Sequence, residues 1–325
     1  MCDHPLRRDL VEGMLTYRIA TPLISWIFHL PPVASLALPL VFSLCALIVV
    51  HRAVRVRSDR DFASVVTIGV ACSSTFHYTN CYLGLPDSLT HLTSAITLIG
   101  SPLMVIGGVL IGCLNDERAV LALPFVALWR CEVLERLDWR SRRSWFAIVQ
   151  AAAPLAIGLV IVSLVRHALK VGWIGDGIKQ PALYSEMKAS VREFRPWLES
   201  WGVWFANWLN GPGWLWLILL TPCISSRWRP AAVPAALLLL ALVLVCASTF
   251  IVADVARSIG FAYPAAILAA FWVYRGNPKT AGNLMLLVAA LQVITPAVWI
   301  YQKWQWLQFR PFPWELWLYL HRSPT

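Results

Sequence analysis

Residues 32–51 read PVASLALPLVFSLCALIVVH and contain no aspartate, glutamate, lysine or arginine. A helix of about 20 apolar residues is long enough to cross the ~30 Å hydrocarbon core of a bilayer. The stretch 144–165, SWFAIVQAAAPLAIGLVIVSLV, has the same character. These two stretches predict that the chain is a helical protein of the lipid bilayer.

The composition of the whole chain agrees with this prediction. Of its 325 residues 58% are hydrophobic and 14% are charged, and the mean hydropathy is +0.64. An average soluble domain has roughly a quarter charged residues. The predicted fold class is therefore an all-α, polytopic membrane bundle with about eight spans. The apolar runs that predict them are 32–51, 61–79, 90–113, 144–165, 213–226, 230–253, 260–274 and 282–301.

Three apolar stretches depart from the ordinary length of a span. The runs 213–226 and 260–274 are short, so their flanks extend them or they are broken helices. The stretch 119–129, AVLALPFVALW, is about half a span. It predicts a re-entrant piece, an interfacial helix or a buried half-helix.

The orientation follows from the basic residues, which membrane proteins retain on the cytoplasmic side. Fourteen lysines and arginines follow the first, third, fifth and seventh predicted spans, whereas the loops 80–89 and 254–259 hold one arginine between them. Both chain ends are therefore predicted outside. This gives an outer N-terminal segment 1–31, a bundle 32–301 with an outer loop 166–212, and a Trp-rich outer tail 302–325. The segment 1–31 would cross without a signal peptide, unless a further helix precedes residue 1.

The outer loop ends in an aromatic helix predicted at about 183–210. Trp197, Trp201, Trp204 and Trp208 recur at spacings of four, three and four, which places them on one helical face. Tryptophan favours the headgroup level of a bilayer, so an interfacial anchor is the first interpretation, and a platform for sugar rings or a lipid carrier is the second. Asn210-Gly211-Pro212-Gly213 is expected to end the helix.

Charge and cysteine usage exclude two other classes. The net charge is +10, but the basic residues are dispersed between apolar segments, which argues against a nucleic-acid partner. The eight cysteines lie mostly singly in apolar runs and show no metal-ligand spacing, so we expect small core residues and no structural metal.

Two polar clusters flank the first half of the bundle on its predicted outer side. Tyr17 and Arg18 precede the first span, where the guanidinium would bind phosphate or the pair would anchor an interfacial helix. Asn80, Tyr82 and Asp87 share an outer loop without a basic residue. This loop suits the binding of hydroxyl groups, or Asp87 simply caps the helix that follows.

Two further clusters lie later in the chain. Asp116, Glu117 and Arg118 form either a solvated turn that caps the next helix or, if 119–129 is re-entrant, a charged cluster near a cavity. Asp254 and Arg257 are three residues apart and share a helix face. They form either a local ion pair or a pair that points inward at a polar substrate.

Taken in order, four motifs resemble bacterial multi-pass membrane proteins of the GT-C glycosyltransferase type. They are Y-R-x-x-x-P from Tyr17, N-x-Y-x-x-x-x-D-S-L from Asn80 to Leu89, D-E-R with a Pro-containing apolar run from Asp116 to Phe125, and D-x-x-R-S-x-x-x-x-x-P from Asp254 to Pro264.

This resemblance implies a bacterial inner-membrane enzyme that takes a polyprenyl-phosphate-linked sugar as donor for cell-surface glycans. An outer-loop carboxylate would act as the base or as the ligand of a divalent cation, and Asp9 or Glu12 would supply it here. Arg18 and Arg257 would bind phosphate, and Asp87 and Asn80 would bind hydroxyl groups.

Two other functional classes stay open. A transporter or flippase of lipid-linked substrates would use the same polar residues as a pathway and would place charges near the middle of the bilayer. A non-catalytic membrane subunit would need none of them, and would depend on small-residue helix faces and on its Trp-rich outer surface.

Overall fold

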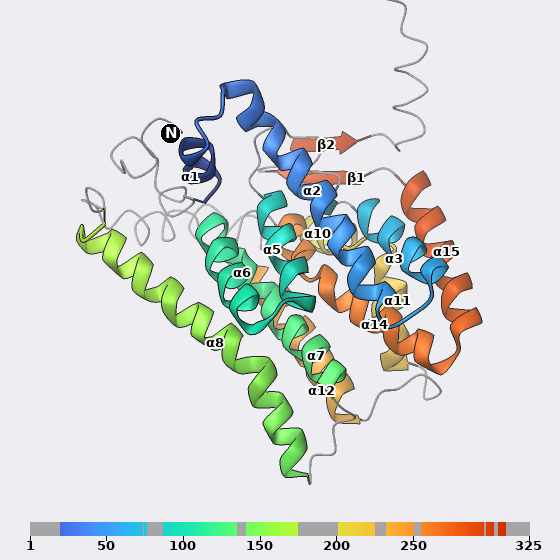
Figure 1. The fold of residues 1–325 in the computed structure, drawn as a ribbon. Coiled ribbons are helices and arrows are strands. Elements are labelled where there is room, and N and C mark those ends of the chain that lie inside the picture. The colour runs from blue at the N-terminus through green and yellow to red at the C-terminus, as the bar shows by residue number, and fades with distance from the viewer. Residues whose placement is uncertain are drawn as a thin grey trace, which may run out of the picture. The chain divides into compact units, whose positions relative to one another are not determined.

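Helices form almost all of the regular structure in the computed structural model, in accord with the predicted fold class (Figure 1). The one exception is a β-hairpin of β1 (Ala297–Tyr301) and β2 (Gln305–Phe309), which pair antiparallel with Ala297 opposite Phe309. The structure describes residues 20–73, 75–76, 87–134, 141–174, 201–224, 232–249, 255–295, 297–301 and 305–309. Within these ranges the structure describes the backbone but not the side chains of residues 132–134, 201–204, 223–224, 232–233, 255–257, 297–301 and 305–309.

The chain forms two compact units. Unit 1 is built from residues 1–49 and 79–194, and unit 2 from residues 50–78 and 195–325. The helix α2 (Pro32–Arg55) contributes to both, with the boundary after Val49.

Unit 1 contains one long helix and several short ones. They are α1 (Ala20–Ile27), α5 (Asp87–Ile99), α6 (Pro102–Asn115), the 3-10 helix η2 (Glu117–Ala122), α7 (Leu123–Leu134) and α8 (Arg142–Val171). The helix α6 packs between α5 and the long α8, and α7 packs on both α5 and α8 (Figure 1). The stretch 119–129 therefore lies within η2 and α7. Its side chains at Ala122, Phe125, Val126 and Trp129 are fully buried, as expected of a buried half-helix.

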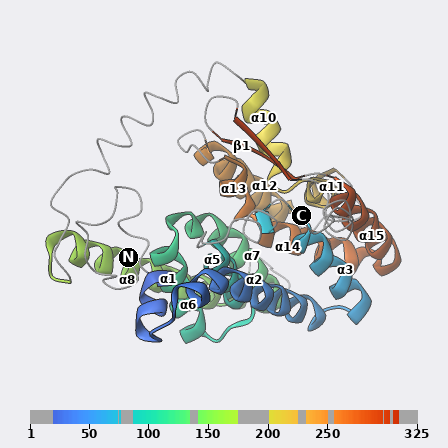
Figure 2. The ribbon, with the colours of Figure 1, turned by 90° about the horizontal axis from the view of Figure 1, so that it is seen from above.

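Unit 2 is a layer of short helices with the β-hairpin. Its helices are α3 (Arg60–Ala71), α10 (Trp201–Asn210), α11 (Leu215–Ile224), α12 (Ala232–Ser248), α13 (Val255–Gly260), α14 (Tyr263–Gly276) and α15 (Pro278–Ile294). The helix α14 is buried along most of its length, where α11 and α15 cover it. Seen from above, α10 lies against α13 and β1 (Figure 2).

Within the described residues two helices are long and apolar enough to cross a membrane. They are α2 with 24 residues and α8 with 30 residues, at the places where the sequence predicts the first and fourth spans. Three shorter apolar helices are α6, α12 and α15. Many large apolar side chains on α2 and α8 are exposed, among them Val33, Ile48, Val160 and Leu164. Such surfaces suit contact with lipid.

Two predicted spans need correction. The stretch 90–113 is not one helix, because α5 ends at Ile99 and α6 begins at Pro102. The run 282–301 is helical only to Ile294, and residues 297–301 form the strand β1.

The predicted end of the aromatic helix is confirmed, since α10 ends at Asn210 and Gly213 takes a left-handed backbone with φ of 58°. Of the four tryptophans on its predicted face, only Trp208 has a described side chain. Its indole donates to Thr249 Oγ1 at 2.9 Å, so Trp208 bonds to the protein rather than standing free at a headgroup level. The part of the predicted helix from 183 to 200 lies outside the described residues.

Candidate functional site

The helices α5 and α6 form an antiparallel hairpin, and its geometry decides where the polar residues meet. The chain turns at Gly100 and Ser101, where the Ser101 hydroxyl accepts a bond from Met104 N at 3.5 Å and Pro102 opens α6. The arms approach closely because α6 presents glycines to α5. A Cβ at Gly108 would lie 2.8 Å from Thr97 Cγ2, and one at Gly112 would lie 2.6 Å from Thr93 Oγ1.

The hairpin brings Asp87, at the start of α5, to the residues that follow α6. Asp116 Oδ1 accepts bonds from Arg118 N and Nε, both at 2.9 Å, and Oδ2 accepts from Nη2 at 2.6 Å. The same Nη2 lies 3.5 Å from Asp87 Oδ1. We call these three residues the Asp–Arg–Asp cluster. Two separately predicted clusters therefore form one group.

The cluster is buried. The exposed fractions are 3% for Asp87, 0% for Asp116 and 8% for Arg118, while Glu117 between them is half-buried. The prediction that Asp116 and Arg118 lie in a solvated turn is therefore wrong. The capping role is confirmed, because Asp116 accepts the backbone N–H of Arg118 at the start of η2.

The charges of the cluster favour donors over anions as ligands. Asp116 takes two side-chain donors of Arg118 in a bidentate arrangement, the strongest form of this pair. Asp87 stands in the first turn of α5, where the positive end of the helix dipole stabilises a carboxylate. Two carboxylates share one guanidinium, so hydroxyl groups fit this cluster better than a phosphate does.

A second polar network lies beside the cluster and joins four helices. Thr21 Oγ1 of α1 donates to Asn115 Oδ1 at 2.7 Å, and Asn115 Nδ2 donates to Thr90 Oγ1 at 2.9 Å. Arg166 of α8 donates from Nη2 to the carbonyl of Cys113 at 2.6 Å. The ends of α1, α5, α6 and α8 therefore meet at one end of unit 1.

The helix α5 is polar and buried at the same time. Below Asp87, its buried polar side chains are Ser88, Thr90, His91, Thr93, Ser94 and Thr97. Two of these hydroxyls bond to carbonyls of their own helix, Thr93 Oγ1 to Thr90 O at 3.0 Å and Thr97 Oγ1 to Ser94 O at 2.6 Å. Polar groups buried in a membrane protein are expensive and commonly mark a substrate or ion pathway.

The other predicted site residues are not among those that the structure describes, apart from the backbone of Arg257. Asp9, Glu12, Tyr17, Arg18, Asn80, Tyr82 and Asp254 lie outside the described residues, as does the side chain of Arg257. The backbone of Arg257 belongs to α13 in unit 2. The site assignments for these residues stay predictions.

Sequence reasoning missed Thr21 and Thr90 and gave Asn115 no role. A signal for Thr90 was present, because THLTS at 90–94 is too polar for the apolar span predicted over 90–113. Thr21 carried no comparable signal, since only the fold brings α1 to the end of α6.

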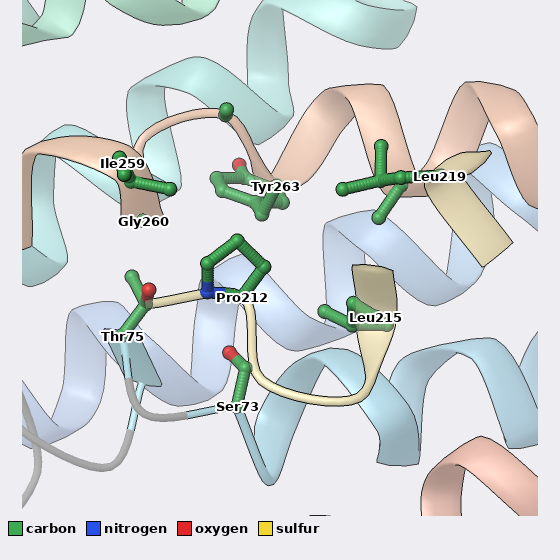
Figure 3. Close-up of a pocket in the computed structure, with 10 residues that line it drawn as sticks. Ser73, Thr75, Pro212, Leu215, Leu219, Ile259, Gly260 and Tyr263 are labelled. Carbon is green, nitrogen blue, oxygen red and sulfur yellow. The ribbon is translucent and has the colours of Figure 1, made fainter. Parts of the chain in front are cut away.

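Unit 2 contains a small hollow around Pro212 and Tyr263 (Figure 3). Ser73, Thr75 and Gly260 close one side, and Leu215 and Leu219 close the other. Its space suits about one water molecule, which is too little for a sugar. Gln292 Nε2 donates to the Pro212 carbonyl at 2.8 Å, so the polar groups near it hold the turn after α10.

In the described part of the chain no group of three or more histidine, cysteine, aspartate or glutamate side chains is placed to hold a metal ion. The Asp–Arg–Asp cluster contributes two carboxylates and a cation, which is a poor donor set for a divalent metal.

Compared with protein-family models, with curated proteins and with solved structures, the chain matches none.

Proposed function

We propose that this chain is a multi-pass membrane protein that binds the sugar of a lipid-linked substrate at the Asp–Arg–Asp cluster and transfers that sugar during assembly of a cell-surface glycan. The supporting observation is the burial of Asp87, Asp116 and Arg118 where two short, broken helices end. Charged groups at such places in membrane proteins mark sites for polar substrates.

In this proposal the chain still crosses the bilayer eight times, but by a different set of helices. The α5–α6 hairpin, with arms of 13 and 14 residues, turns back at Gly100 and Ser101, and in this proposal it enters and leaves the bilayer on one side. The third crossing, predicted at 90–113, is instead made by η2 and α7, whose six and 12 residues together rise about 30 Å. The other crossings are α2, α3, α8, α11, α12, α14 and α15.

The revised topology keeps the charge bias that set the orientation. Arg118 moves to the side of Asp87, and the remaining thirteen of the fourteen basic residues stay on the predicted cytoplasmic side. The cluster then lies at the outer boundary of the bilayer, where a lipid carrier would present its sugar.

The chemistry assigned to the cluster is binding and orientation. Asp87 accepts a hydrogen bond from a sugar or acceptor hydroxyl, Arg118 holds the Asp87 carboxylate, and Asp116 fixes the Arg118 side chain. A carboxylate placed in this way also serves as a general base for a hydroxyl. The roles of Asp9 or Glu12 as the acid, and of Arg18 and Arg257 at the phosphate, are part of the same proposal.

The test uses the full chain in proteoliposomes with a radiolabelled polyprenyl-phosphate hexose and a membrane extract as the acceptor source. Asp87→Asn is expected to abolish the glycosylated product while insertion and protein level stay normal. Asp61→Asn, which removes an exposed carboxylate of unit 2, is the matched control. Full product from both Asp87→Asn and Arg118→Gln would overturn the site.

The broken helices favour a second candidate, a transporter or flippase of lipid-linked substrates. Discontinuous helices commonly form the binding sites of transporters. The same proteoliposomes separate the two functions. Movement of labelled lipid between leaflets without covalent change would support transport, and covalent transfer of the label would support the enzyme.

A further inference from the structure

Two loops of unit 2 form a strongly basic edge. The end of α2 with the following turn carries Arg52, Arg55, Arg57 and Arg60, and the end of α14 with the following turn carries Arg275 and Lys279. All are exposed except Arg57, which is half-buried. We call these six residues the basic rim. Only Asp59 and Asp61 offset them in these turns.

One hydrogen-bonded pair joins the two loops. The Tyr274 hydroxyl donates to Asp59 Oδ2 at 2.8 Å and accepts from Asp59 N at 3.2 Å. Asp59 Oδ1 also accepts the N–H of Phe62 at 2.8 Å, which caps α3. The Asp59 carboxylate thereby accepts hydrogen bonds from the backbone of α3 and from Tyr274, and the six basic side chains outnumber the two carboxylates of these turns.

Two of these cations lie over one aromatic ring. The Cζ atom of Arg57 is 5.3 Å from the centroid of Phe271, and that of Arg275 is 5.8 Å from it. Both distances are within the range of cation–π contacts. The two guanidiniums come from different loops and cannot be farther apart than the sum of these distances. A ring flanked by two guanidiniums concentrates positive charge, which attracts an anion.

The surface next to the rim is apolar and exposed. Val56 is 75% exposed, Ile68 of α3 is 48% exposed, and Leu286 of α15 is 59% exposed. Since α3 packs along α15, Ile68 and Leu286 belong to one pair of helices whose first turns carry the rim residues Arg60 and Lys279, and Val56 lies in the turn before α3. A phosphate headgroup beside apolar chains is the chemistry of an anionic phospholipid, and guanidinium pairs phosphate oxygens bidentately.

We propose that Arg57 and Arg275, held over Phe271, form a binding site for the phosphate headgroup of an anionic phospholipid, whose acyl chains lie along α3 and α15. The site is separate from the Asp–Arg–Asp cluster and does not depend on the activity proposed there. It lies on the predicted cytoplasmic side, where membranes are rich in anionic lipid.

The experiment is a lipid titration of the full-length protein in mild detergent, followed by native mass spectrometry. The probes are phosphatidylcholine, phosphatidylglycerol and diphosphatidylglycerol. Wild type is expected to retain the two anionic lipids and not phosphatidylcholine. Arg57→Gln with Arg275→Gln is expected to weaken the retention about thirtyfold, about fivefold for each guanidinium that contacts the headgroup.

The matched control is Arg60→Gln with Lys279→Gln, which removes the same charge from the same loops but leaves the Phe271 contacts. It is expected to weaken retention by a much smaller factor, and equal weakening by the two double variants would overturn a defined site. Inorganic phosphate is expected to compete poorly. Displacement of lipid by equimolar phosphate would show a site for free phosphate instead. If the first double variant fails to fold, Arg275→Gln alone carries the test, with an expected loss of about fivefold.

Discussion

Arg118 Nη2 lies 3.5 Å from Asp87 Oδ1, although the two residues stand at opposite ends of a stretch that hydropathy alone would treat as one span. The contact is possible because α5 and α6 run antiparallel and return the chain to its starting side. The proposed site therefore depends on the reversal at Gly100 and Ser101.

Loss of the Arg118 cation should lower the free energy of unfolding substantially. Arg118→Gln leaves the fully buried Asp116 carboxylate without its bidentate partner, and breaking a buried pair on one side costs about 3–5 kcal/mol. Asp116→Asn added to Arg118→Gln should recover part of this loss because it removes the uncompensated charge. SDS titration in mixed micelles measures the free energy of unfolding. Arg142→Gln, at an exposed position, is the control, and an equal cost for the two arginines would contradict the burial of the pair.

The close approach of α5 and α6 makes neighbouring glycines unequal. Gly108→Ala places a methyl group 2.8 Å from Thr97 Cγ2 and 3.2 Å from the Thr93 carbonyl oxygen, so we expect a loss of about 1–3 kcal/mol. Gly107→Ala meets nothing within 4 Å and should be neutral or stabilising by up to about 1 kcal/mol, because alanine favours a helix. The same unfolding measurement compares them. A hairpin that tolerates both substitutions alike would not be packed as described.

The pair of Asp59 and Tyr274 should make stability fall in acid. The N–H of Phe62, and then the Tyr274 hydroxyl, hold the pKa of Asp59 below its ordinary value of 3.8. A lowered pKa stabilises the fold above the ordinary value, and this contribution is lost as the pH falls through the pKa of the folded state. Stability measured from neutral pH to below 3.8 should drop less in Asp59→Asn than in wild type. Parallel curves for the two proteins would exclude this role of the carboxylate.

The sequence could predict the long spans because length and apolarity decide them locally. It also located the end of α10 at Asn210, since Gly213 supplies the left-handed backbone that closes such a turn. The reversal inside 90–113 was missed because mean hydropathy is insensitive to the direction of the chain. Gly100, Ser101 and Pro102 form a helix end, a cap and a first helical residue, and they were the local signal for it.

The site was harder to predict for the same reason. Asp87 and Arg118 were assigned to opposite sides of the membrane, so no sequence argument could pair them. The partners of Asn115 come from α1 and α5, and only packing brings these helices to the end of α6. The residue types indicated that polar side chains form a binding site. Which of these side chains contact one another was determined by the packing of the helices.

The most direct test asks on which side of the membrane residue 117 lies. Single cysteines replace Glu117, Arg142 or Lys170 in a chain without its eight native cysteines, and a membrane-impermeant maleimide labels sealed vesicles of known orientation. The ends of α8 provide the two references, since Arg142 and Lys170 lie at opposite ends of that long helix. The re-entrant hairpin predicts that position 117 is labelled from the same side as position 170. Labelling of position 117 from the side of position 142 would contradict the hairpin, and with it the meeting of Asp87 and Arg118 at one membrane boundary.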